Sequence, residues 1–143
     1  MITLTTRVLV IDDDIVLTDM LKISLEPNSF EVITANSGEE GLKAVRFQKP
    51  EIIILDLVMP GVNGWQIGKA IREISNAPIL VLSALDKPEV VTRALEEGAD
   101  DFLIKPVSME MLVAHLNNLI RRARAEREAT AAKAHATHFS LGG

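Results

Sequence analysis

An uninterrupted apolar run at 52–55, Ile-Ile-Ile-Leu, ends at a carboxylate, Asp56. Four branched apolar residues in a row are typical of a strand that is buried on both faces, as in the parallel sheets of α/β proteins. Pro60 and Gly61 follow closely and indicate a turn. Open α/β sheets bind ligands beside the carboxyl ends of their strands, so Asp56 stands where a functional group is expected.

Segments typical of strands and of helices alternate along the chain. Strand-like runs occupy about 7–12, 30–35, 51–56, 79–83 and 101–104, and helix-like stretches follow each of them. This alternation predicts βα repeats around a parallel sheet. Five repeats fit a flavodoxin-like, doubly wound, five-stranded parallel sheet of order 2-1-3-4-5 with five helices.

The ends and faces of the helices have their own signals. Asp14 is a good N-cap, Ser37 and Glu40 form a capping box, and Gly98 is a natural residue just past a helix end. Apolar residues recur at helical spacing in three of the helices. In the first they are Val16, Met20 and Ile23, and in the third, which follows Asn63 and Gly64, they are Ile67, Ile71 and Ile74. In the last, which starts near Ser108, they are Leu112, Leu116, Leu119 and Ile120.

Composition limits the class of protein. A length of 143 residues allows one domain with an appendage, and a hydrophobic fraction of 48% is enough for a core. The chain has no cysteine, which excludes disulfides and thiolate metal sites. The first residues lack the regions of a signal peptide, and no apolar run approaches the roughly 18 residues of a membrane span. We therefore expect a cytoplasmic protein with no membrane attachment.

Charge is divided unevenly along the chain. Residues 121–143 contain five basic and two acidic side chains, a net charge of +3, so the total of −5 leaves −8 on residues 1–120. An acidic body is a poor surface for nucleic acid and a fair site for cations. If the protein acts on DNA, residues 1–120 are not the part expected to touch it.

Charged and hydroxyl side chains end other strands at the same predicted sheet edge. Asp12 and Asp13 follow the first strand, Ser83 ends the fourth and Lys105 follows the fifth. Carboxylates gathered there with Asp56 favour a hard cation such as Mg²⁺ or Mn²⁺. A cationic lysine and a hydroxyl donor beside them suit the free oxygens of a phosphoryl group.

Each of these residues has a plainer interpretation when it is taken alone. An acid after a strand can cap the next helix, and we assign that role to Asp14. Lys105 can extend its ammonium group into solvent, and Ser83 can simply form a turn. These interpretations lose weight because the predicted sheet order gathers the side chains at one edge.

Four motifs, in order and at matching spacing over about residues 7–122, resemble the receiver domain of two-component response regulators. They are Asp12-Asp13, the segment 56–61, the segment 82–84 and the segment 98–106. The last of these resembles the subfamily that has a winged-helix DNA-binding output domain. Each motif is weak alone, and their specificity comes from all four falling in register on predicted strand ends.

The resemblance implies that Asp56 accepts a phosphoryl group from the phosphohistidine of a sensor histidine kinase, or from a small phosphodonor, to form an acyl phosphate. Asp13, Asp56 and the backbone carbonyl of Val58 would hold Mg²⁺, and Asp12 would act largely through water. Lys105 would bind a phosphoryl oxygen, and the peptide bond after it would be cis.

The resemblance also implies how the signal leaves the site. Ser83 would move to bond the phosphoryl group, and Phe102 would rotate inward behind it. The face formed by the fourth helix, fifth strand and fifth helix would then shift between two states. Members of the subfamily form homodimers through that face. Kinase specificity is expected on the first helix and in the loop near Pro106.

The chain departs from the family pattern at several positions. Phe102 occupies a place that is often Tyr, so it can act only as a packing switch, or be an ordinary core residue. Val58 and Leu85 cannot orient an attacking water, which predicts slow loss of the phosphoryl group. Three residues, Val91, Met111 and His115, stand where the dimer face of the subfamily carries charged residues. The charged rim of that face is otherwise matched by Asp100, Asp101 and Arg122. Val91 and Met111 either form an apolar contact there or merely flank the core.

These inferences predict an N-terminal extension at 1–6, a receiver domain at 7–122 and a helix extension or linker at 123–143. Residues 134–143 lack a helical stripe, and 138–143 is similar to the strand that opens a winged-helix domain. The expected function is a switch, not an enzyme, that controls a DNA-binding domain not in this chain. A stand-alone receiver acting by protein binding is the alternative. A Mg²⁺-dependent phosphohydrolase is disfavoured, because that class places a second acid where Val58 stands.

Overall fold

The computed structural model describes residues 5–62 and 64–142, with residues 137–142 described by their backbone alone; Asn63 therefore lies outside the description. Its single sheet has five parallel strands in the order β2-β1-β3-β4-β5. The strands are β1 (Thr6–Ile11), β2 (Phe30–Ala35), β3 (Ile52–Leu55), β4 (Ile79–Ser83) and β5 (Asp101–Ile104). The predicted fold class and strand order are confirmed.

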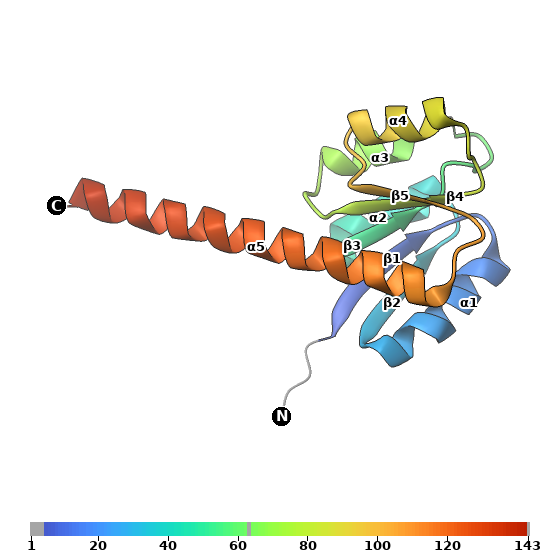
Figure 1. Cartoon of the computed structure of the whole chain (residues 1–143), viewed down its shortest axis with the longest axis horizontal. Coiled ribbons are helices and arrows are strands. Elements are labelled where there is room, and N and C mark those ends of the chain that lie inside the picture. The colour runs from blue at the N-terminus through green and yellow to red at the C-terminus, as the bar shows by residue number, and fades with distance from the viewer. Residues whose placement is uncertain (1–4, 63, 143) are drawn as a thin grey trace.

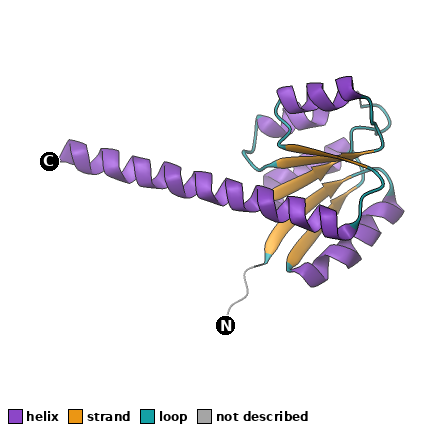
Figure 2. Cartoon of the chain, in the orientation of Figure 1, coloured by secondary structure: helices purple, strands orange, loops and turns teal. Residues whose placement is uncertain are grey.

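Helices cover both faces of this sheet (Figures 1 and 2). They are α1 (Ile15–Leu25), α2 (Gly38–Gln48), α3 (Gln66–Arg72), α4 (Pro88–Glu96) and α5 (Met109–Gly142), with a short 3₁₀ turn, η1 (Glu26–Asn28), after α1. One core cluster joins the sheet to α2, α3 and α4, and a second joins it to α1 and α5. The fold is therefore doubly wound, as predicted.

The central strand β3 explains why its sequence is an unbroken apolar run. Ile53 and Leu55 belong to the cluster under α2, α3 and α4, whereas Ile52 and Ile54 belong to the cluster under α1 and α5. Successive side chains of a strand point to opposite faces, and here both faces are covered. All four side chains are buried, and Asp56 follows directly where the strand leaves the core.

Helix α1 begins as predicted, but its expected apolar stripe is not its buried face. Asp14 caps the helix by accepting a hydrogen bond from the backbone N–H of Leu17 at 3.1 Å. Val16, Met20 and Ile23 are 70%, 58% and 73% exposed. The residues buried against the sheet are Thr18, Leu21 and Leu25. The stripe therefore predicted the helix correctly, but it does not mark the face that packs on the sheet.

Smaller differences concern the ends of elements. Strand β3 is shorter than predicted by one residue at each end, and β1 is shifted by one residue. Helix α3 ends at Arg72, so Ile74 lies beyond it and is partly exposed. The capping box differs in its return bond. Ser37 accepts from the N–H of Glu40 at 3.1 Å, but the Glu40 carboxylate accepts from the N–H of Asn36 at 2.9 Å.

Helix α5 continues far past the sheet. Its first part buries the predicted residues Leu112, Leu116, Leu119 and Ile120. The Arg124 guanidinium then binds the Glu51 carboxylate at 2.9 Å and holds the helix beside the start of β3. The remainder projects away from the domain (Figure 1).

The end of α5 differs from the expectation of a linker at 134–143 or of an opening strand at 138–143. The backbone is helical through Gly142. Alanine, which recurs in this segment, has the highest helix propensity and needs no buried stripe to favour a helix. Among the residues that the structure describes, no helix is both long enough and apolar enough to cross a membrane. The division into 1–6, 7–122 and 123–143 stays a prediction.

Candidate functional site

Three carboxylates meet where β1 and β3 end side by side. Ile11 pairs with Leu55 in the sheet, and the Asp56 N–H donates to the Ile11 carbonyl at 3.0 Å. The next residues, Asp12 and Asp56, therefore share one edge. Oxygens from Asp12, Asp13 and Asp56 all lie within 4.8 Å of one another. Asp12 and Asp56 are only 3% and 6% exposed, whereas Asp13 is open to solvent.

Lys105 supplies the positive charge that faces these acids. Its Nζ lies 2.9 Å from Asp12 Oδ2 and 3.4 Å from Asp56 Oδ2. Burial acts to lower the pKa of Lys105, but the hydrogen bond to Asp12 and the negative charge of Asp56 outweigh it and raise the pKa. Lys105 is thus cationic at neutral pH. The peptide bond after it is cis, as the resemblance implied.

Asn36 and Thr18 hold the turn that presents Asp12, and sequence reasoning missed both. The Asn36 side-chain amide donates to the Asp12 carbonyl at 2.9 Å and to Thr18 Oγ1 at 3.0 Å. Asp12 Oδ1 in turn accepts from the N–H of Asp14 at 3.0 Å. A signal was available, because Asn36 follows β2 and the predicted order places β2 beside β1.

Replacing Asn36 with alanine should weaken Mg²⁺ binding by about tenfold, the low end for partners that orient metal ligands. The cause is loss of the two hydrogen bonds that fix the Asp12 turn. Titration calorimetry with Mg²⁺ measures the effect. Asn28→Ala is the matched control, because its amide donates to the Ser24 carbonyl at 3.2 Å in a solvent-exposed hydrogen bond at the end of α1. Equal Mg²⁺ affinity in both variants would contradict the role given to Asn36.

The other predicted residues surround the carboxylates from β4 and the loop after β3. Ser83 is fully buried, and its carbonyl accepts from the Lys105 N–H at 2.9 Å, which joins the ends of β4 and β5. The N–H of Val58 donates to Asp56 Oδ1 at 3.1 Å, while the Val58 residue is half exposed. Phe102 is half buried against the cluster under α2, α3 and α4.

The family model described as Response regulator receiver domain matches residues 8–117 of this chain. The chain belongs to the receiver domain family. This match spans most of the sequence and contains every residue of the site just described. The resemblance inferred from the four motifs is therefore confirmed.

Relatives agree with this assignment of a receiver domain. The chain is 40% identical over 122 residues to the transcriptional regulatory protein AfsQ1 of Streptomyces coelicolor, covering 85% of this chain and 53% of that protein. It is 38% identical over 120 residues to the DNA-binding response regulator MtrA of Mycobacterium tuberculosis, covering 84% and 53%. This receiver domain thus spans about half the length of the curated relatives it matches.

Solved structures support the fold of the receiver domain. A two-component response regulator from Clostridium difficile superimposes with a TM-score of 0.79 at 30% identity, covering 82% of this chain and 98% of that one. The receiver domain of the Francisella response regulator 1452 gives a TM-score of 0.77 at 34% identity, with coverage of 82% and 98%.

The donor set of this receiver domain fits Mg²⁺. All three groups offer carboxylate oxygens, the ligands that Mg²⁺ prefers, and the set has no nitrogen or sulfur donor that would favour a softer metal. Lys105 neutralises only one of three negative charges, which leaves charge for a divalent cation to balance. The residues that would hold the ion are Asp12, Asp13 and Asp56, with the Val58 carbonyl as the resemblance implies.

On the face of α4, β5 and α5, the predicted rim acids of the receiver domain already have partners within the chain. The Arg72 guanidinium contacts Asp100 Oδ2 at 2.5 Å and also donates to the Gly98 carbonyl at 3.0 Å. His115 Nδ1 lies 2.5 Å from Asp101 Oδ2. Arg122 is exposed. The Asp101–His115 contact was not predicted, because His115 was interpreted only as the replacement of a charged residue on the dimer face.

Proposed function

We propose that this domain is a phosphorylation-activated signalling switch in which Asp56 accepts a phosphoryl group from a sensor histidine kinase. The observation that carries the proposal is a single cluster of charged side chains in which Asp12 and Asp56 are buried. Asp56 ends the central strand, two further carboxylates lie within 4.8 Å, and the Lys105 ammonium is 3.4 Å from its Oδ2. A lone structural aspartate needs no such surroundings.

In the transfer, an Asp56 carboxylate oxygen forms a bond to phosphorus as the phosphorus–nitrogen bond of the phosphohistidine breaks. The electron pair of that bond stays on the imidazole, and the product is an acyl phosphate on Asp56. Lys105 would neutralise a phosphoryl oxygen, and the Ser83 hydroxyl would donate a hydrogen bond to another. Bound Mg²⁺ would supply further charge neutralisation. Such transfers depend mainly on positioning and electrostatics.

The exposed stripe on α1 supports a protein as the phosphodonor. Ile15, Val16, Met20 and Ile23 form an apolar surface on the helix that begins two residues after Asp13. Exposed apolar patches of this kind mark sites of protein interaction. A kinase domain seated on α1 would bring its phosphohistidine to the adjacent carboxylates. Since such donors act inside the cell, we place this domain in the cytoplasm.

The signal would leave through Ser83 and Phe102, which lie at the end of β4 and on β5. Their movement would bias the face of α4, β5 and α5 and thereby a DNA-binding output domain; the relative MtrA is named a DNA-binding response regulator. Met111 and Ile104 are exposed on this face and Val91 is half exposed, which supports homodimerisation through apolar contact. Sedimentation with and without beryllofluoride measures this association.

The test of the proposed function is phosphorylation by a small donor. With acetyl phosphate and Mg²⁺, intact mass spectrometry should show one added phosphoryl group, and peptide mapping should place it on Asp56. Hydrolysis of p-nitrophenyl phosphate should show no turnover. If acetyl phosphate did not label the protein, the proposed switch would be refuted. Sustained hydrolysis of p-nitrophenyl phosphate would also refute it and would favour a phosphohydrolase.

The phosphoryl group should be lost slowly, because the side chains two residues after Asp56 and Ser83 are apolar. Val58 is exposed at the site and Leu85 packs against the core, so neither orients a water molecule. Val58→Asn should speed dephosphorylation by about tenfold, less than the roughly 100-fold that a positioned general base provides. Decay of acetyl-phosphate-loaded protein gives the rates. A wild-type half-life of seconds, equal to that of the variant, would contradict this.

A further inference from the structure

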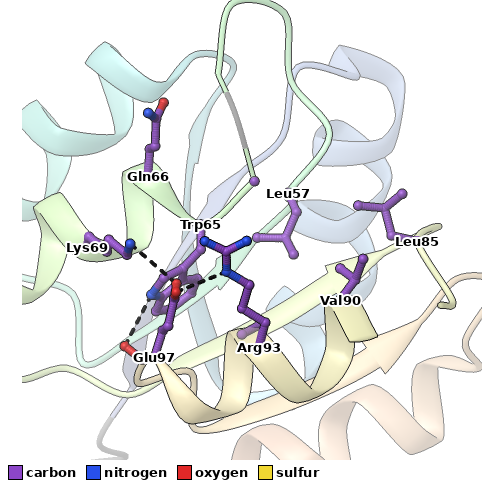
Figure 3. A pocket seen from close by; sticks show the side chains of 10 residues that line it. Leu57, Trp65, Gln66, Lys69, Leu85, Val90, Arg93 and Glu97 are labelled. Atoms are coloured by element: carbon purple, nitrogen blue, oxygen red, sulfur yellow. Dashed lines mark hydrogen bonds and ion pairs between the residues drawn. The ribbon is translucent and has the colours of Figure 1, made fainter. Parts of the chain in front are cut away.

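A separate cavity lies between α3 and α4, lined also by the loops that follow β3 and β4 (Figure 3). Its volume is about 370 Å³, within the range of sites that bind small molecules. The apolar side chains that line it are Leu57, Trp65, Leu85, Val90 and Ala94. The cavity therefore offers an apolar interior large enough for a fused pair of aromatic rings.

Trp65 forms a fixed wall of this cavity. Its indole N–H donates to the Glu97 carbonyl at 3.2 Å, and the residue is buried. The ring lies directly against α3 at Gly68, where an added Cβ would come within 2.4 Å of Trp65 Cζ3. The absence of a side chain at Gly68 thus lets the ring pack closely on the helix. A wall held this way is preorganised for an apolar ligand.

The cavity rim carries an excess of positive charge. Lys69 Nζ on α3 and Arg93 Nε on α4 lie 3.5 Å and 3.1 Å from different oxygens of Glu97. The pKa of Glu97 is lowered, mainly by the hydrogen bond from Arg93, so this carboxylate is ionised at neutral pH. Two cations then share one anion. In Figure 3 the Arg93 guanidinium also extends past Glu97 toward Leu57 and Trp65.

We propose that this cavity binds small aromatic carboxylates. The aromatic body would lie against Trp65, Leu85 and Val90, and the carboxylate would accept hydrogen bonds from the Arg93 guanidinium and the Lys69 ammonium. Arginine presents a planar fork that matches a carboxylate, and burying an apolar body beside it adds affinity. Glu97 competes with the ligand for both cations. None of the three site carboxylates lines this cavity, although Leu57 directly follows Asp56 in the chain.

The direct test uses the indole N–H signal of Trp65, the one tryptophan in this chain, in the ¹⁵N-labelled chain of residues 1–143. The probe is naphthalene-2-carboxylate, and naphthalene-2-carboxamide is its neutral counterpart. The carboxylate should shift the indole signal saturably with a Kd on the order of 1 mM or tighter. The carboxamide should bind roughly tenfold more weakly, because charge-assisted hydrogen bonds are lost.

Charge variants of the rim should change affinity in opposite directions. Arg93→Gln and Lys69→Gln each remove the excess cation and should weaken carboxylate binding about threefold, while Glu97→Gln removes the competitor and should strengthen it about threefold. Lys43→Gln, a surface lysine paired with Glu39 at 3.6 Å on α2, is the matched control and should change nothing. None of these residues belongs to the Asp56 site.

A further variant tests whether the ligand enters the cavity. Val90→Phe fills part of the space and should abolish the shift of the Trp65 signal, with the remaining spectrum reporting that the domain is folded. Absence of a saturable shift in the wild type would overturn the proposal. Equal affinity for the carboxylate and the carboxamide would overturn it too. So would rim variants whose affinities do not change in opposite directions when a cation or the Glu97 anion is removed. Phosphorylation of Asp56 is not needed for any arm of this test.

Discussion

Asp56→Asn is expected to abolish phosphorylation by acetyl phosphate. The amide lacks the negative charge and the nucleophilic oxygen that form the acyl phosphate, and no neighbouring acid has the same setting. Asp12 is held by Lys105 at 2.9 Å, and Asp13 is exposed to solvent. Labelling measured by intact mass spectrometry should therefore fall to background.

The variant should remain folded, so the loss can be assigned to chemistry. An asparagine oxygen can still accept the Val58 N–H that Asp56 Oδ1 accepts at 3.1 Å. Removing one of three clustered acids also relieves repulsion in the absence of metal. Asp14→Asn is the matched control, because Asp14 belongs to the same run of acids but caps α1. If Asp56→Asn were labelled as strongly as Asp14→Asn, Asp56 would not be the acceptor.

The sheet, and the edge at which the charged side chains gather, were predictable because the apolar pattern of each strand reflects how its faces are buried. In β3 both faces are covered, so the sequence has no polar position until Asp56. The order 2-1-3-4-5 then places Asp12, Asp56, Ser83 and Lys105 on consecutive strand ends. Residues that are distant in sequence become neighbours through topology alone.

The buried face of α1 was not predictable, because two apolar stripes run along this helix. Leu17, Leu21 and Leu25 recur every four residues, and Val16, Met20 and Ile23 recur at similar spacing on an adjacent face. Periodicity identifies a helix in either case. Only packing against the sheet decides which stripe is buried, and it selects Leu21 and Leu25.

Long-range polar contacts leave no signal within a single segment of the sequence. Arg72 binds the Ala77 carbonyl at 2.5 Å and Asp100 at 2.5 Å, so it joins the end of α3 to the starts of β4 and β5. Asn36 supports the Asp12 turn in the same way. Neither side chain belongs to a local motif. Their partners are fixed by how elements pack, which a pattern of residues in one segment does not describe.

Lys105→Met is expected to destabilise the metal-free domain by about 2–3 kcal/mol. The substitution leaves the carboxylates of Asp12 and Asp56, whose side chains are only 5% and 7% exposed, without their cation. Removing one partner of a buried ion pair typically costs about 3–5 kcal/mol. We expect less here, because the Lys105 side chain is 24% exposed and partly screened by solvent. Urea unfolding followed by Trp65 fluorescence measures the change.

Two conditions separate this electrostatic cause from loss of packing. Mg²⁺ should reduce the destabilisation, because a cation held by the acids replaces the missing charge. Raising the pH should also reduce it, but only in alkaline solution. The folded-state pKa of Lys105 is raised, so its contribution is complete at neutral pH and is lost as the pH rises through that value.

Lys43→Met, which removes an exposed lysine with a side chain 67% accessible, should change stability by less than about 0.5 kcal/mol. A Lys105→Met loss as small as that control would show that Lys105 does not stabilise the fold by offsetting the charge of the acids. A loss that Mg²⁺ leaves unchanged would show that the three carboxylates do not hold the ion. If the expected results are obtained, the excess negative charge of the cluster lowers the stability of the metal-free domain. The same excess would let the cluster hold the cation that assists phosphoryl transfer to Asp56.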